Sequence, residues 1–200
     1  METLIFDYNE VFKGPRAQDM REFLELRFRV FVQGLGWSLP SRDGMESDQY
    51  DNPNCTYILV KRSGRVVAGA RIIPSCQDWF GQTNLLRDAA KGRITSIAPD
   101  LFPSDYDFAD SYECSRLSVD VDQLSNLEVA QVFKHLGQAF AQVAQERGFR
   151  TYLSLSPPAL LRKFRALGFD VSTVGEKYIC QDDGRRYLVL SLSNFQAIAA

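Results

Sequence analysis

Residues 26–51 gather cationic, aromatic and acidic side chains into one short segment. An arginine and two aromatics come first, at Arg27, Phe31 and Trp37. Three carboxylates follow within six residues, at Glu46, Asp48 and Asp51. A ligand with positive charge and a flat apolar surface would suit these groups, because carboxylates offset a cation and aromatic faces attract one. Ordinary surface loops are also acidic, so this segment alone does not define a function.

A second group of chemically useful residues lies in the segment 111–119, which has the composition of a β-strand. Glu113 and Arg116 lie three residues apart in it. Side chains alternate between the two faces of a strand, so regular geometry would place Arg116 off the Glu113 face. Either a bulge in the strand or a supporting role for Arg116 would reconcile the two, and the sequence leaves both open.

Composition narrows the class of protein. A chain of 200 residues has a natural size for one domain, and we take 1–200 as a single domain. The net charge of −2 and the pI near 5.5 give no electrostatic footprint for general nucleic-acid binding. The cysteines are far apart and His135 is the one histidine. This argues against a zinc site, so we expect no metal.

Targeting signals are not evident in the sequence. The first residues lack the basic region and the long apolar run of a secretory signal. No stretch approaches the ~20 apolar residues that a membrane span requires. We therefore expect a cytoplasmic protein with reduced thiols and no membrane partner.

Hydrophobic periodicity predicts alternating strands and helices. The first half reads as a strand at 2–8, a helix at 17–33, a loop at 34–54 and hairpin strands at 56–60 and 66–73. The second half reads as loops and short helices at 76–109, a strand at 111–119, a helix between Ser125 and Gly148, a strand at 152–156, a helix at 157–168 and a strand at 186–192. Gly64 supplies the positive φ of the hairpin turn.

Local signals also set the helix ends. Ser125 and Glu128 fit a capping box, and Ser156 is a possible cap for the last helix. The order of elements favours an α/β fold, a single domain with a mixed twisted sheet flanked by helices on both faces.

The ordered set of polar and aromatic residues resembles the signature of the acyl-homoserine-lactone synthases, the autoinducer synthases of bacterial quorum sensing. The resemblance runs from about residue 20 to residue 170 and rests on Arg27, Phe31, Trp37, Asp48, Asp51, Arg71, Glu113, Ser115 and Arg116. It implies a fold like that of the N-acetyltransferases, with a mixed sheet splayed to admit an acyl chain. The predicted elements agree with this fold.

The resemblance also implies a reaction. The amine of S-adenosylmethionine would take an acyl group carried as a thioester on acyl carrier protein. The methionine carboxylate would then close on its own γ-carbon, which gives the lactone and methylthioadenosine. S-adenosylmethionine is a substrate in this scheme, so the resemblance implies no cofactor. Some synthases of the family accept acyl-coenzyme A, so the donor stays open.

Residue roles follow from the same resemblance. S-adenosylmethionine would be bound by Arg27, Phe31, Trp37, Asp48 and Asp51. The aromatics can pack on adenine or face the sulfonium, and the two aspartates can offset positive charge directly or through arginines. A purely structural ion pair between Asp48 and Arg71 is the competing interpretation.

The implied catalytic residues are Glu113, Arg116 and Arg71. Glu113 is the candidate general base that takes the amine proton, through water, before attack on the thioester. Backbone amides of its strand can donate to the developing oxyanion.

The implied acyl pocket contains Ser115, Leu117 and Ser154. Leu117 stands where the family more often has Phe. Ser154 falls near a Thr that the family links to 3-oxo acyl chains, and serine keeps a hydroxyl there. The sequence therefore does not give the acyl length or the oxidation state at the β-carbon.

A basic group near the C-terminal helices suggests a docking surface for acyl carrier protein, which is acidic. Its members are Arg147, Arg150, Arg162, Lys163 and Arg165. Basic residues at helix ends also favour the helix dipole and solubility, so this second interpretation stays open.

Two other functions compete with the synthase. A coenzyme-A-dependent N-acyltransferase of the same fold would carry a pyrophosphate-binding loop, but the nearest string, residues 134–139, begins with the wrong residue and falls inside a helix. The other is a non-catalytic relative that only binds a ligand or partner. The presence of Glu113, Arg71 and Arg116 argues against it.

Overall fold

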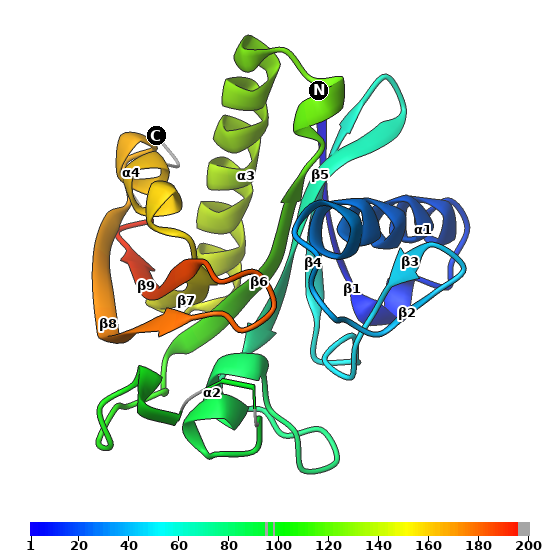
Figure 1. Ribbon diagram of the computed structural model, residues 1–200. Coiled ribbons are helices and arrows are strands. Elements are labelled where there is room, and N and C mark those ends of the chain that lie inside the picture. The colour runs from blue at the N-terminus through cyan, green and yellow to red at the C-terminus, as the bar shows by residue number, and fades with distance from the viewer. Residues whose placement is uncertain (95, 98, 196–200) are drawn as a thin grey trace. The chain divides into compact units, whose positions relative to one another are not determined.

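The computed structural model describes residues 1–94, 96–97 and 99–195 (Figure 1). Its main strands are β1 (Glu2–Asp7), β4 (Thr56–Arg62), β5 (Arg65–Pro74), β6 (Ser111–Val119), β7 (Thr151–Ser156), β8 (Asp170–Ile179) and β9 (Arg186–Ser193). They form one sheet in the order β1-β4-β5-β6-β7-β9-β8. The sheet is mixed, because β6 and β7 are parallel whereas the β1–β4, β4–β5, β7–β9 and β8–β9 pairs are antiparallel.

The described α-helices are α1 (Arg16–Arg27), α2 (Leu85–Ala90), α3 (Asn126–Arg147) and α4 (Pro158–Ala166), with 3-10 turns and a π-helix between them. The chain divides into two compact units. Unit 1 contains Met1–Ile72 and Arg116–Ala139, and unit 2 contains Ile73–Ser115 and the chain from Phe140 onward. Strand β6 and helix α3 each contribute residues to both units.

Unit 1 has helices on both faces of its strands. Phe23 of α1 lies edge-on to Tyr57 of β4 at 6.2 Å. Gly69 of β5 leaves room for that helix, since an added Cβ would meet the Phe23 ring at 2.7 Å. On the opposite face, Thr3 of β1 bonds to His135 of α3 at 2.9 Å. The alternation of side chains along the strands accounts for both layers.

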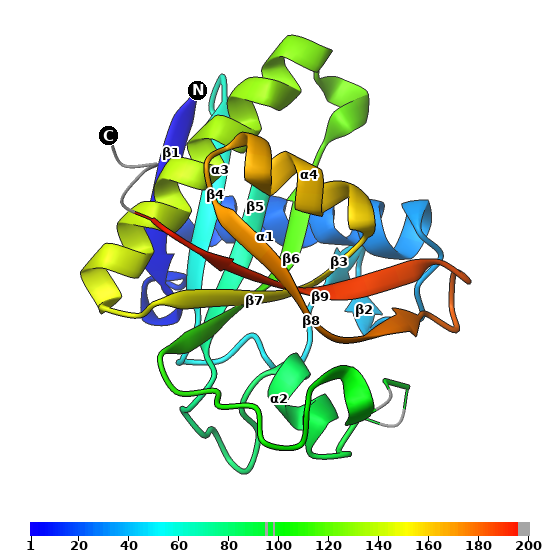
Figure 2. The ribbon, with the colours of Figure 1, turned by 90° about the vertical axis from the view of Figure 1, so that its left-hand side faces the viewer.

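Unit 2 is layered in the same way. Leu153 of β7 packs into an apolar cluster with Leu86 of α2, whereas the neighbouring Tyr152 points to the other face. There the Tyr152 ring lies 5.5 Å from the ring of Phe140 in α3. Figure 2 shows α2 below β7, and α4 running along β8 and β9. The predicted class, a mixed sheet flanked by helices, is confirmed.

Several predicted elements are confirmed closely. The hairpin turn has positive φ at both Ser63 and Gly64. The capping box forms, with the Glu128 amide donating to Ser125 Oγ at 3.3 Å and the Ser125 amide donating to Glu128 at 2.9 Å. Strand β6 matches its predicted bounds.

Other predictions were wrong in detail. The helix predicted at 17–33 is α-helical only to Arg27 and continues as a π-helix, η2 (Phe28–Gly34). The loop predicted at 34–54 contains a small hairpin, β2 (Ser41–Arg42) and β3 (Met45–Glu46), which lies beside α1 in Figure 1. Ser156 does not cap α4, because the helix begins at Pro158 and Pro157 occupies the N-cap position. The Ser156 hydroxyl instead pairs with that of Ser154.

Strand β8 was missed altogether. Most of its residues are exposed, so the alternation that identifies a half-buried strand is faint there. Within the described part of the chain, no helix is both long and apolar enough to cross a membrane.

Candidate active site

Arg27, the last residue of α1, is fully buried between two carboxylates. Its Nε donates to Glu46 Oε2 at 2.6 Å. Its two terminal nitrogens bond to the two oxygens of Asp51, at 2.8 and 3.0 Å. This two-point pairing uses the planar fork of the guanidinium and fixes both partners in orientation.

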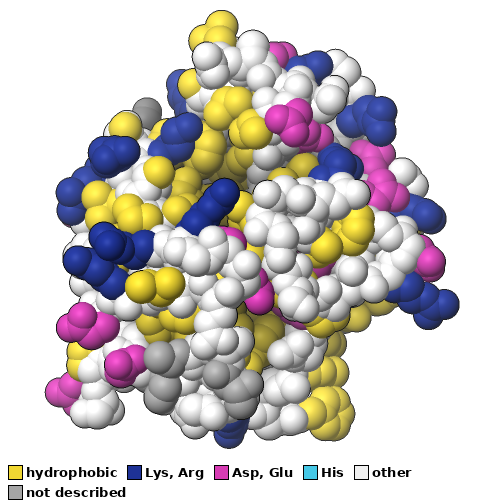
Figure 3. Space-filling view, in the orientation of Figure 1, with side chains coloured by type: hydrophobic (Ala, Val, Ile, Leu, Met, Phe, Trp, Pro, Cys, Tyr) yellow, Lys and Arg dark blue, Asp and Glu magenta, His cyan; other side chains and the backbone are white. Residues whose placement is uncertain are grey.

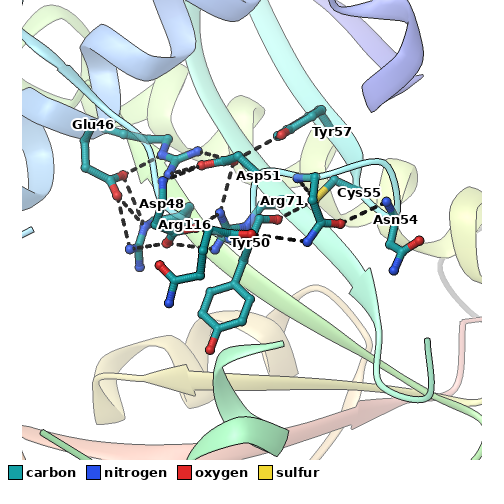
Figure 4. Close-up of polar contacts among 12 residues, drawn as sticks. Glu46, Asp48, Tyr50, Asp51, Asn54, Cys55, Tyr57, Arg71 and Arg116 are labelled. Carbon is teal, nitrogen blue, oxygen red and sulfur yellow. Dashed lines mark hydrogen bonds and ion pairs between the residues drawn. The ribbon is translucent and has the colours of Figure 1, made fainter. Parts of the chain in front are cut away.

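Two further arginines extend the network. Arg71 of β5 bonds to both oxygens of Asp48, at 2.5 and 3.2 Å, and lies 3.0 Å from Asp51. Arg116 of β6 donates to Glu46 at 3.1 and 3.2 Å and to Asp48 at 2.7 Å. Figure 4 shows these side chains turned toward one another. All of them belong to unit 1.

These contacts close a ring in which each carboxylate bridges two arginines and each arginine bridges two carboxylates. In order, the ring is Arg27, Asp51, Arg71, Asp48, Arg116 and Glu46. Three positive and three negative charges balance within it. Charges buried to this extent require such pairing, because the desolvation of a single unpaired ion is very unfavourable.

The backbone of the loop 48–55 positions two of the three acidic members, Asp48 and Asp51. The Tyr50 amide donates to Asp48 Oδ1 and the Asp48 amide donates to Asp51 Oδ2, both at 2.9 Å. Aspartates favour such tight turns because their short side chains bond to nearby amides. Cys55 closes the loop by donating its thiol to the Tyr50 carbonyl at 2.7 Å. Burial raises the pKa of Cys55 to about 12, so the thiol keeps its proton.

The ring perturbs the ionisation of its members. Burial would raise the pKa of Asp48, but Arg71 and Arg116 outweigh it and hold that pKa below its ordinary value. Arg71 and Arg27 lower the pKa of Asp51 in the same way, against burial. Conversely, burial would lower the pKa of Arg71, but Asp48 and Asp51 raise it above the usual range. These groups therefore stay charged at neutral pH.

Glu46 is the ring member that sequence reasoning left out of both the substrate-binding and the catalytic sets. It is fully buried and holds Arg27 and Arg116 together. Its place in the acidic segment 46–51 was a signal, but three acids in one loop do not show which arginine each one contacts. Those arginines come from elements far apart in the chain.

The two aromatics predicted for the ligand site form a stack. The Phe31 and Trp37 rings lie 5.2 Å apart and 15° from parallel. Phe31 is buried, and the Arg116 guanidinium lies over its ring at 5.6 Å from the centroid. Trp37 is partly exposed. We refer to Phe31 and Trp37 together as the aromatic shelf.

Strand β6 departs from regular geometry at Arg116, whose φ is +55°. A bulky residue rarely adopts this left-handed conformation outside constrained sites. It breaks the two-residue alternation between Glu113 and Arg116, which is the irregularity that the first of the two sequence-based alternatives, a bulge, called for. The Arg116 side chain is 8% exposed, so it is almost wholly committed to the ring.

Glu113 lies in the unit 2 part of β6 and is buried. Its Oε2 accepts a hydrogen bond from the Leu86 amide of α2 at 2.8 Å. This bond fixes the carboxylate against α2. Parallel pairing of β6 with β7 covers Ser111–Glu113 against Thr151–Leu153. Ser154, the next residue on β7, is paired on its other side with Leu190 of β9.

The predicted acyl-pocket residues have different environments. Ser154 is buried and its Oγ lies 2.9 Å from Oγ of Ser156, so two hydroxyls, not one, face the same side of β7. Ser115 and Leu117 are partly buried on β6, Ser115 in unit 2 and Leu117 in unit 1. Sequence reasoning assigned Ser156 to a helix cap and so missed this pair.

The predicted docking residues all belong to unit 2. Figure 3 shows several Lys and Arg side chains over α4 and β8. Arg162 is exposed and Lys163 is half-buried on α4. Arg165 differs, because its guanidinium donates to the Val171 carbonyl at 2.8 and 3.3 Å and thereby ties α4 to β8. Arg150 is exposed and lies 3.8 Å from Asp110, whereas Arg147 is exposed at the end of α3.

Comparison with known proteins gives consistent results. A family model described as autoinducer synthase matches residues 13–190. An acyl-homoserine-lactone synthase of Aliivibrio fischeri is 28% identical over 186 residues, which cover 90% of this chain and 89% of the relative.

Solved structures show the same likeness. TofI, crystallised in a ternary complex with an inhibitor and MTA, is 26% identical with a TM-score of 0.74, over 100% of this chain and 96% of TofI. BjaI, a coenzyme-A-dependent acyl-homoserine lactone synthase, has a TM-score of 0.71 at 19% identity, over 98% of this chain and 84% of BjaI. At the level of fold alone, a putative N-acetyltransferase from Lactobacillus plantarum has a TM-score of 0.57 at 13% identity, over 96% of this chain and 99% of that protein.

Proposed function

The chain belongs to the autoinducer synthase family, and from this premise we propose how it carries out the synthesis of an acyl-homoserine lactone. The protein is an acyltransferase of that family. In the proposed reaction, the amine of S-adenosylmethionine attacks an acyl thioester, so a C–N bond forms and the thiol leaves. The methionine carboxylate then attacks its own γ-carbon and expels methylthioadenosine.

The ring of ion pairs with its aromatic shelf is the observation that carries this proposal. S-adenosylmethionine presents an adenine, a sulfonium, an ammonium and a carboxylate. Trp37, partly exposed and stacked on Phe31, offers an aromatic face to the adenine or the sulfonium. The ring fixes Asp48 and Asp51 rigidly, and rigid groups lose little entropy when a ligand binds. TofI, which is 26% identical to this chain, was crystallised with MTA. MTA stands for methylthioadenosine, the product expected here.

Arg71 and Arg116 act in this scheme as positioning residues. Arg71 is fully buried against Asp48 and Asp51, so it serves the ligand through those carboxylates. Arg116 both closes the ring and covers the Phe31 ring. Their proposed contribution is therefore the shape and charge of the S-adenosylmethionine site.

Glu113 is the proposed general base. Its carboxylate is buried and held by the Leu86 amide, which fixes its direction. A positioned carboxylate can take the ammonium proton, through water, as the nitrogen attacks. Ser115, Leu117 and Ser154 are proposed to line the acyl chain, with Ser156 now added beside Ser154.

The proposed donor is acyl carrier protein, which docks on Arg147, Arg150, Arg162 and Lys163. These residues carry positive charge in a chain that is acidic overall. Arg165 is removed from the contact set because the Val171 carbonyl engages its guanidinium. Acyl-coenzyme A is the alternative donor, which BjaI uses within the same fold. Both donors and S-adenosylmethionine are intracellular, so we place the enzyme in the cytoplasm as one domain over 1–200.

Product analysis tests the proposal. The purified protein is incubated with S-adenosylmethionine and matched acyl thioesters of both carriers, and the reaction mixture is examined by mass spectrometry. We expect an N-acyl-homoserine lactone and an equal amount of methylthioadenosine. The proposal fails if a range of acyl-carrier and acyl-coenzyme-A donors yields neither compound.

A further inference from the structure

The π-helix η2 is an unusual element at a position that affects the aromatic shelf. It covers Phe28–Gly34, directly after Arg27 of the ring. π-helical geometry is rare, occurs mostly as single turns inside α-helices, and is frequent at functional sites. Here the Leu35 amide donates to the Val30 carbonyl, five residues earlier, at 3.1 Å. Such geometry persists only where surrounding contacts support it.

The shelf depends on this geometry. Phe31 lies within the π-helix, and the Trp37 amide donates to the Phe31 carbonyl at 3.0 Å. That bond holds Trp37 over the Phe31 ring. A π-helical turn contains about one residue more than the 3.6 residues of an α-helical turn. Conversion to α-helical geometry would remove this extra residue from the turn and rotate the residues that follow by about 100°. A return to α-helical geometry would therefore turn Phe31 away from Trp37 and from Arg116.

One ion pair links the start of the π-helix to the sheet. Arg29 Nη2 lies 2.8 Å from Asp120 Oδ2, with Arg29 46% exposed and Asp120 14% exposed. Asp120 directly follows β6, and its amide donates to the Val67 carbonyl of β5 at 2.9 Å. Asp120 is therefore anchored to the same two strands that carry Arg71 and Arg116. All of these residues belong to unit 1.

We propose that Arg29 and Asp120 are positioning residues, whose ion pair holds the π-helix in the register that presents Phe31 and Trp37 to S-adenosylmethionine. This inference rests on the proposed function for the identity of the ligand. Arg29 and Asp120 bond to each other, outside the closed ring of six charges. Their effect on the site passes through the backbone of the π-helix.

The expected effect is on binding and not on global stability. Exposed ion pairs contribute little to folding, so the melting temperature should fall by no more than about 3 °C. Loss of the pair lowers the fraction of molecules with a formed shelf. The apparent affinity falls by that same fraction, so we expect KM for S-adenosylmethionine to rise by about three- to tenfold. Saturating substrate restores the shelf, so kcat should change little.

The experiment compares Arg29→Gln, Asp120→Asn and the double variant. Arg21→Gln is the matched control, because Arg21 also belongs to an exposed ion pair, with Glu25 at 3.2 Å on the preceding helix. Each protein is assayed for KM and kcat, and for direct binding of S-adenosylmethionine by calorimetry. If the pair acts as a unit, the double variant should be no weaker than either single variant.

A second readout needs no ligand. The chain has two tryptophans, so a Trp79→Phe background leaves Trp37 as the reporter. Acrylamide should quench Trp37 fluorescence more strongly in Arg29→Gln than in Arg21→Gln, because the stack on Phe31 is loosened. Unchanged KM, affinity and quenching in both Arg29→Gln and Asp120→Asn would overturn the inference. If the unmodified protein binds no S-adenosylmethionine, the proposed function fails instead, and the quenching comparison still decides whether the pair orders the shelf.

Discussion

Each residue of the charge ring depends on two neighbours, and this makes single substitutions costly. Asp51→Asn removes the negative charge that Arg27 and Arg71 share. Removal of one partner from a buried ion pair typically costs ~3–5 kcal/mol, because the remaining charge is buried without compensation. We expect a loss of that size in the free energy of unfolding, measured by urea denaturation.

The exposed pair of Arg42 and Asp43 supplies the control for this prediction. Its members lie 3.5 Å apart and are 93% and 74% exposed. Asp43→Asn should change stability by less than about 0.5 kcal/mol. Equal effects at Asp43 and Asp51 would show that the ring carries no special stability.

The lowered pKa values of Asp48 and Asp51 predict an acid-labile fold. A group whose folded pKa is depressed contributes stability that is fully present above its unfolded pKa, near 3.9, and is lost as the pH falls toward the folded value. The ring should therefore add no pH dependence to stability between about pH 6 and pH 8. Below about pH 4 the melting temperature should fall, and it should fall less steeply in Asp51→Asn. A melting temperature that stays constant down to about pH 2.5 would contradict the shifted pKa values.

A substitution at Glu113 can distinguish an effect on catalysis from an effect on folding. Glu113→Gln keeps the size of the side chain, and its amide oxygen can still accept from Leu86. The variant should fold normally but lose about 10²–10⁴-fold in turnover, since it cannot take the proton. Near-normal turnover with an unchanged melting temperature would exclude Glu113 as the general base.

At the scale of elements, local sequence signals predicted most of the architecture. The hairpin around Gly64 and the helix after Ser125 follow from turn and capping chemistry within a few residues. The π-helix did not, because its apolar residues fit an α-helical pattern equally well. Its geometry depends on contacts with distant elements such as Asp120, which no local pattern reports.

The backbone of strand β8 at Gly175 lies against the backbone at Leu101. This close approach allows a prediction about a single element. Gly175 has φ +63°, and an added Cβ would clash with the Leu101 carbonyl. Gly184 has nearly the same φ, +66°, in open space. Alanine in a left-handed conformation costs ~1–2 kcal/mol at either position. The clash should add ~1–3 kcal/mol for Gly175→Ala, measured by chemical denaturation of both variants.

Equal destabilisation in Gly175→Ala and Gly184→Ala would show that the approach of the turn Pro99–Leu101 to β8 is not tight in solution. The comparison isolates packing, because the backbone strain is matched.

At the scale of the molecule, most of the site residues could be identified from the sequence, but their contacts with one another could not. Recognition of an ordered set supplied Arg27, Asp48, Asp51, Arg71 and Arg116, and the structure brings these five into one ring. Glu46 was missed as a partner because contacts between distant segments are fixed only by the fold. The left-handed Arg116 likewise follows from its place in the ring and not from strand propensity.

The proposed docking residues of unit 2, Arg147, Arg150, Arg162 and Lys163, lead to a prediction about which acyl donor the enzyme uses. The double variant Arg162→Glu with Lys163→Glu reverses two charges on α4 and leaves the ring and Glu113 untouched. If acyl carrier protein docks there, KM for that donor should rise by at least about tenfold at low salt, because like charges now oppose an acidic partner. KM for S-adenosylmethionine should not change.

Salt and donor identity separate docking from a general defect. Exposed charges are screened when the Debye length falls to ~3 Å at 1 M salt, so the difference between variant and unmodified protein should shrink there. With acyl-coenzyme A the variant should lose less, since no acidic protein surface has to dock. Lys177→Glu reverses one charge at an exposed residue on β8. It is the single-charge control, and its effect on KM for acyl carrier protein, expressed in kcal/mol, should be less than half that of the double variant. Full activity of the double variant with acyl carrier protein at low salt would instead identify this surface as a solvated helix face, with the donor bound elsewhere.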